Sequence, residues 1–82
     1  MGTVQADILS DAKIAIRTQN YEKAVRLLRP LADRGDKEAQ YHLAVLYRNG
    51  QGVKQNPAKA AQWMKSSAKQ GYASAQYSMG IM

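Results

Sequence analysis

The sequence has no cysteine, no phenylalanine and a single histidine, His42. The absence of cysteine excludes a disulfide framework and thiolate chemistry. His42 has no second histidine or cysteine with which to share a metal ion, so we expect it to be a solvated or helix-capping residue. Ser66 and Ser67 have no neighbouring base that could activate a nucleophile. We therefore predict that the protein is not an enzyme and has no catalytic residue, metal, cofactor or small-molecule substrate.

Long hydrophobic runs are also missing. No segment approaches the roughly 18 apolar residues that a membrane-spanning helix needs. Residues 1–6 lack the basic and apolar regions of a signal peptide. We expect no membrane span and a soluble protein, which is cytoplasmic, or periplasmic if a signal segment has been removed.

Acidic residues are absent from the second half of the chain. All six lie within the first 38 residues, where seven Lys and Arg nearly balance them, whereas residues 39–82 contain five Lys and Arg and no acid. A basic segment of this kind favours an acidic partner. The charge leaves open an alternative function, in which a basic surface binds nucleic acid or anionic envelope components. Nucleic acid is the weaker choice, because no nucleic-acid-binding motif accompanies the charge.

The positive feature of the sequence is a repeat of 36 residues. Residues 33–41 align with residues 69–77, and further pairs obey the same shift along the whole unit. These pairs are Asn20 with Asn56, Lys23 with Lys59, Ala24 with Ala60, Leu28 with Met64, Ala32 with Ala68 and Leu43 with Met79. Small residues match small ones and large apolar residues match large apolar ones, as the packing of stacked repeats requires.

Apolar residues within each unit recur with helical spacing, as in Ala39, Leu43, Leu46 and Tyr47, and no segment alternates with the period of a strand. The pattern predicts five helices, at 4–18, 21–34, 37–48, 57–70 and 73–82.

The expected turns contain the residues that turns prefer. Gly35 and Gly71 follow helices and are suited to a left-handed backbone conformation there. Asn56 is a suitable N-cap, and Pro57 is suited to the first helical position. Pro30 lies inside the second helix, where we expect a kink and not a boundary, because the apolar pattern continues beyond it.

This set of residues resembles the Sel1-like repeat, a branch of the tetratricopeptide superfamily whose units read A-x-x-x-L-G-x-x-Y-x-x-G-x-G-V and then D-x-x-K-A-x-x-W. The matching positions are Ala39, Leu43, Tyr47, Gly50, Gly52, Val53, Lys59, Ala60, Trp63, Ala68 and Gly71. Ala44 stands where the family has glycine, and Asn56 where it has aspartate. Both replacements suit the fold, because Ala permits close helix contact and Asn caps a helix as well as Asp does.

The resemblance implies an all-α fold, a right-handed α–α superhelix of about five helices in a single repeat domain over residues 1–82. A plain tetratricopeptide-like repeat is expected at 5–38, a Sel1-like repeat at 39–74, and a partial third repeat or capping helix at 75–82. Family members are mostly adaptors and are common in bacteria. The resemblance therefore implies a bacterial scaffold that binds a peptide or helix of a partner protein.

In proteins of this kind the first helix of each pair lines a concave groove that holds the partner. Transferred to this sequence, that arrangement gives seven candidate partner-binding residues: Lys13, Arg17, Tyr41, Val45, Arg48, Tyr77 and Ile81. Tyr and Arg are enriched at interface hot spots. The alternative is that Tyr41 and Tyr77 only pack between repeats.

The C-terminal end of the sequence is apolar, with Tyr77, Met79, Ile81 and Met82. Repeat stacks usually end in polar caps. We therefore predict that this end self-associates or is covered by further repeats.

Overall fold

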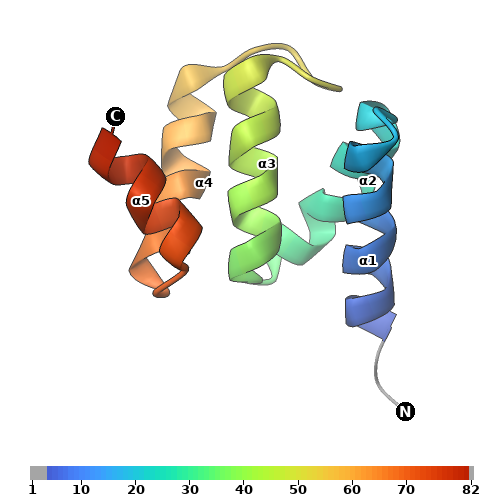
Figure 1. Cartoon of the computed structure of the whole chain (residues 1–82), viewed down its shortest axis with the longest axis horizontal. Helices are drawn as coiled ribbons and strands as arrows, with labels where there is room; N and C mark the ends of the chain where they lie inside the picture. Colours follow the sequence, from blue (N-terminus) through green and yellow to red (C-terminus); the bar gives the residue numbers. More distant parts are fainter. Residues whose placement is uncertain (1–3, 82) are drawn as a thin grey trace.

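The computed structural model describes residues 4–81, with side chains described for residues 7–80, and forms five helices in this region (Figure 1). They are α1 (Val4–Arg17), α2 (Tyr21–Asp33), α3 (Lys37–Asn49), α4 (Pro57–Lys69) and α5 (Ala73–Ile81). The described residues contain no strand. The all-α prediction is confirmed, and the described helix ends fall within one residue of the predicted ones. The predicted end of the last helix, at Met82, lies outside the described residues.

Each helix packs against the next one along the chain, so the molecule is a stack of sequential helix pairs. α3 stands in the middle, between the pair formed by α1 and α2 and the pair formed by α4 and α5 (Figure 1). This order follows from the repeat, because a helical hairpin cannot bury its apolar side alone and is covered by its neighbour.

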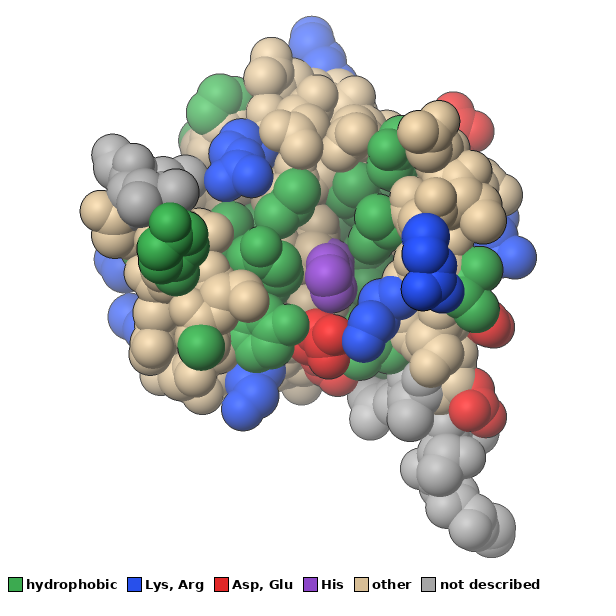
Figure 2. Space-filling view, viewed as in Figure 1, with side chains coloured by type: hydrophobic (Ala, Val, Ile, Leu, Met, Phe, Trp, Pro, Cys, Tyr) green, Lys and Arg blue, Asp and Glu red, His purple; other side chains and the backbone are tan. Residues whose placement is uncertain are grey.

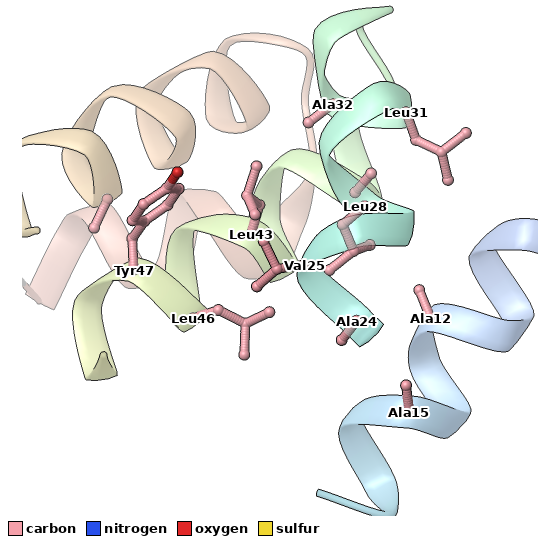
Figure 3. Packing of buried hydrophobic residues seen from close by; sticks show 12 residues of the cluster. Ala12, Ala15, Ala24, Val25, Leu28, Leu31, Ala32, Leu43, Leu46 and Tyr47 are labelled. Atoms are coloured by element: carbon pink, nitrogen blue, oxygen red, sulfur yellow. The ribbon is translucent and has the colours of Figure 1, made fainter. Parts of the chain in front are cut away.

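The main core joins the first four helices (Figure 3). Leu28 and Leu43 are fully buried in it, together with the small side chains of Ala12, Ala24 and Ala60. Burying one leucine side chain contributes about 1.5–3 kcal/mol. A second cluster, formed by Ala44, Met64 and Ala75, joins α3, α4 and α5. Trp63 packs against both clusters and so connects them.

The turns confirm the predicted roles of glycine and asparagine. Gly35, Gly52 and Gly71 all have positive φ angles. Gly52 has a second reason to lack a side chain, because a Cβ atom there would lie 2.5 Å from the carbonyl oxygen of Tyr21. The side chain of Asn56 accepts a hydrogen bond of 3.1 Å from the backbone N–H of Lys59, which caps α4.

α2 continues through Pro30 to Asp33, so Pro30 is not a helix boundary, as predicted. Proline cannot donate the helical hydrogen bond that the carbonyl of Arg26 would accept. Both residues are exposed, so water can hydrate that carbonyl.

Polar side chains form a set of contacts between repeats that the apolar pattern does not reveal. The hydroxyl of Ser67 on α4 donates a hydrogen bond of 2.6 Å to the carbonyl oxygen of Lys37. Gln40 on α3 donates to the carbonyl of Ala32, and Gln70 donates to the side-chain oxygen of Gln40. These bonds fix the position of the α3 N-terminus between the two neighbouring helices.

Candidate partner-binding face

One side of α3 is neither core nor fully exposed. Five side chains spaced three or four residues apart form this side, and all five are half-buried: Glu38, Tyr41, His42, Val45 and Arg48. We call these residues the α3 row. The opposite side of the helix, with Ala39, Leu43 and Leu46, is buried in the core. The row is therefore held in a fixed orientation by the packing behind it.

α1 contributes a charged edge beside this row. The Nζ atom of Lys13 donates a hydrogen bond of 2.8 Å to Oε2 of Glu38, with the two side chains 48% and 29% exposed. This bond raises the pKa of Lys13 and lowers that of Glu38. Arg17 lies one helical turn beyond Lys13 and is exposed. We define the α1–α3 face as the α3 row together with Lys13 and Arg17.

His42 lies at the centre of this face, with an acidic side chain beneath it, hydrophobic side chains around it and Lys or Arg side chains at one edge (Figure 2). Its Nε2 atom is 3.6 Å from Oε2 of Glu38, which is too long for a hydrogen bond, and no described residue forms a hydrogen bond with it. Burial lowers the pKa of His42, which favours the neutral imidazole. The expectation of a solvated or capping histidine is therefore wrong, because the side chain is only 23% exposed and its Nε2 atom is buried.

Tyr41 extends from the α3 row towards the second half of the molecule. Its ring meets the ring of His42 edge-on, with centroids 5.3 Å apart, and lies at 5.4 Å from the ring of Tyr72 in the turn before α5. Burial raises the pKa of Tyr72. Tyr41 thus packs between repeats, which was the alternative considered for it, while part of its side chain remains exposed.

The predicted residues fall into two groups in the structure. Five of the seven (Lys13, Arg17, Tyr41, Val45 and Arg48) lie on the α1–α3 face. Tyr77 is separate and is 72% exposed on α5, so it does not pack between repeats within the described part of the chain. The side chain of Ile81 lies outside the described side chains.

Glu38 and His42 belong to the face but were not among the predicted residues. Their spacing on the helix is the signal that could have identified them. Glu38 lies three residues before Tyr41, and His42 lies three residues before Val45, so all four are on the same side of α3. The ion pair between Glu38 and Lys13, by contrast, depends on how α1 packs and has no counterpart in the sequence.

A cavity of about 410 Å³ adjoins the face at the N-terminal end of α3. It is lined by Leu9, Gly35, Asp36, Lys37, Glu38, Gln70 and Tyr72. The carboxylate of Asp36 is already engaged, because it accepts a hydrogen bond of 2.9 Å from the backbone N–H of Ala39. The lining mixes residues of both charges with apolar groups.

Within the described residues there is no group of three or more His, Cys, Asp or Glu that could hold a metal ion. None of the described helices has the length and apolarity required to cross a membrane.

The fold is that of a tetratricopeptide-like helical repeat protein. It consists of sequential helix pairs, with a loop containing Gly50 and Gly52 after α3. A family model described as the Sel1 repeat matches residues 14–36 and 37–72. The chain therefore belongs to the Sel1 repeat family, as its resemblance implied. Sel1 repeats are generally protein-interaction scaffolds and typically non-catalytic, and this match identifies no enzyme family.

Among curated proteins, the chain is similar to an F-box protein of Arabidopsis thaliana, with 40% identity over 60 residues. The aligned region is 73% of this chain and only 16% of the plant protein. The chain thus spans about a sixth of the length of that relative. Because the relative is a plant protein, the expectation of a bacterial source has no support from this comparison.

Proposed function

We propose that this protein is a scaffold module that binds a peptide or helix of a partner protein on the α1–α3 face. The observation that supports the proposal most directly is the partial burial of the α3 row. Five adjacent side chains of mixed chemistry are rigidly oriented yet still accessible. Such pre-organised side chains lose little conformational entropy when a partner binds, which favours affinity.

The composition of the face agrees with this function. Tyr41 and Arg48 are of the residue types that dominate binding energy at interfaces. Val45 adds an apolar surface between them, and the pair Lys13–Glu38 borders it with charge. A binding role, and not catalysis, is what this arrangement supports, because His42 lacks a hydrogen-bonded base or nucleophile among the described residues.

The proposal can be tested by placing a photo-crosslinking amino acid at Val45 on the face, with Gln62 as the matched control. Gln62 is exposed on α4, outside the face. We expect a protein from the source cell to crosslink at position 45 and not at position 62, and the crosslink to be abolished by an unlabelled excess of the wild-type chain. Crosslinking at position 62 alone would contradict the proposal.

The basic second half of the chain supports a second candidate function, the binding of nucleic acid or anionic envelope components. Lys54, Lys59, Lys65 and Lys69 are all exposed. Lys59 is also placed over the ring of Tyr47, at 5.5 Å from its centroid. Binding that falls steeply with salt for any polyanion would favour this function, whereas selective binding that persists at about 0.3 M salt favours the scaffold.

Self-association through α5 is part of the same proposal. Tyr77 and Met79 are large apolar side chains that are 72% and 38% exposed. Burying them against a second copy would remove apolar surface from water. Light scattering of the wild type and of a Tyr77→Gln, Met79→Gln double variant tests this. A clean monomer for the wild type at high concentration would rule it out.

A further inference from the structure

The charges on the α1–α3 face are not fully compensated. Glu38 is the one carboxylate in the α3 row, and its partner is Lys13, at 2.8 Å. Arg17 and Arg48 form no ion pair with any described residue. Two guanidinium groups therefore remain available on this face.

The segments that follow the α3 row contain no carboxylate that could pair with these arginines. No acidic residue occurs in the chain after Glu38, so the turn before α4, the whole of α4 and α5 lack one. His42 adds no compensating negative charge, since imidazole is either neutral or positive. The face therefore has a net positive charge, and Val45 and Tyr41 provide apolar surface beside the central His42.

We infer that the α1–α3 face binds an acidic peptide segment, an inference that rests on the proposed scaffold function. In this segment carboxylates contact Arg17 and Arg48, and an apolar side chain between them rests on Val45 and Tyr41. The planar guanidinium group matches a carboxylate with two parallel hydrogen bonds, which makes arginine better suited to this contact than lysine. Charge complementarity also raises the rate at which such a segment is captured.

Peptide titrations monitored by amide chemical shifts test this inference. The probes are a short peptide of alternating aspartate and leucine, and its neutral counterpart with asparagine in place of aspartate. We expect the acidic peptide to bind at least about tenfold more tightly at pH 7.5 and to shift the amides of Arg17 and Val45.

Matched variants separate the face from general charge. Arg17→Gln and Arg48→Gln each remove one positive charge from the face, and Arg26→Gln removes one from the exposed side of α2. We expect the first two to weaken binding of the acidic peptide by about five- to tenfold and the third by less than about twofold. Circular dichroism checks that each variant remains folded.

Three outcomes would overturn the inference. If the neutral peptide binds the face as well as the acidic one, the face binds peptides but is not selective for acidic ones, and the scaffold proposal stands. If neither peptide shifts the face amides, the acidic-peptide inference fails, while the crosslinking experiment still decides the scaffold proposal. If a single-stranded oligonucleotide binds more tightly than the acidic peptide and all three variants weaken it equally, the ligand is a polyanion bound by overall charge.

Discussion

The rings of Tyr41 and Tyr72 lie 5.4 Å apart, tilted by 49°, and join the first helix of one repeat to the turn that begins the next. Tyr77 occupies the position equivalent to Tyr41 one repeat later, but it is 72% exposed. The same residue type at the same repeat position thus has two environments. The two tyrosines differ in their neighbours. Tyr41 has Tyr72 of the following turn beside its ring, whereas α5, which carries Tyr77, makes its main contacts with α4 and leaves the Tyr77 side chain exposed.

This contrast predicts different stabilities for two matched variants. Tyr41→Ala should lower the free energy of unfolding by about 1–3 kcal/mol, because it removes half-buried area and an aromatic pair. Tyr77→Ala should change it by less than about 0.5 kcal/mol, as expected for an exposed side chain. Urea unfolding of the monomer measures both. Equal losses in the two variants would show that Tyr41 contributes no packing between repeats.

The hydrogen bond from Ser67 to the carbonyl of Lys37 can be isolated with a neighbouring serine as control. Ser67→Ala removes this 2.6 Å bond, whereas Ser66 has no side-chain hydrogen bond to any described residue. Both changes increase helix propensity by the same amount. We therefore expect Ser67→Ala to be less stable than Ser66→Ala by about 1 kcal/mol, as measured by chemical unfolding. Identical stabilities would mean that this bond gives no net stabilisation.

Gly52 provides a test of close backbone packing. Gly52→Ala and Gly71→Ala both place a Cβ atom on a residue with positive φ, which costs about 1–2 kcal/mol in either case. At Gly71 the new atom meets nothing within 4 Å, whereas at Gly52 it lies 2.5 Å from the carbonyl oxygen of Tyr21. Gly52→Ala should therefore lower the free energy of unfolding by roughly a further 1–3 kcal/mol, because the loop must move away from α2. Melting temperatures of the two variants provide the comparison, and a smaller loss at Gly52 would contradict the packing.

His42 predicts a pH dependence of stability. Burial lowers the pKa of His42 in the folded state, so the unfolded chain binds the extra proton first as the pH falls. The free energy of unfolding should therefore be highest above the ordinary histidine pKa of about 6.5 and decrease below it. Glu38, Lys13 and Asp36 are the charged groups that face the ring, and the acids oppose this effect without reversing it.

His42→Leu should remove this decrease, since leucine has no proton to bind. It should leave stability at pH 7.5 unchanged or higher, because the Nε2 atom lacks a hydrogen-bond partner among the described residues. Urea unfolding between pH 7.5 and about 5.5 tests this window, in which Glu38 stays ionised because its pKa is lowered by Lys13. An unchanged slope in the variant would assign the pH dependence to another group.

Much of the candidate site, but not all of it, could be predicted from the sequence. Tyr41, Val45 and Arg48 could be placed together because they recur on one side of a single helix. Glu38 and His42 share that spacing, yet they were missed because a lone histidine and a helix-terminal glutamate have ordinary solvent-exposed roles. Their place on the face becomes visible only in the tertiary structure, where α1 packs so that Lys13 forms an ion pair with Glu38.

The sequence by itself determined the five helices, their turns and the family, because these depend on local spacing: apolar residues every three or four positions, glycine where φ is positive, and a 36-residue period. Only the tertiary structure decided which partners lie across the helices, such as Glu38 beside Lys13 and Ser67 against Lys37, residues that are 25 and 30 positions apart in the chain. Helix periodicity assigns a residue to a side of its own helix. The angle and height at which the next helix packs then determine which side chains meet and which, like Tyr77, remain exposed.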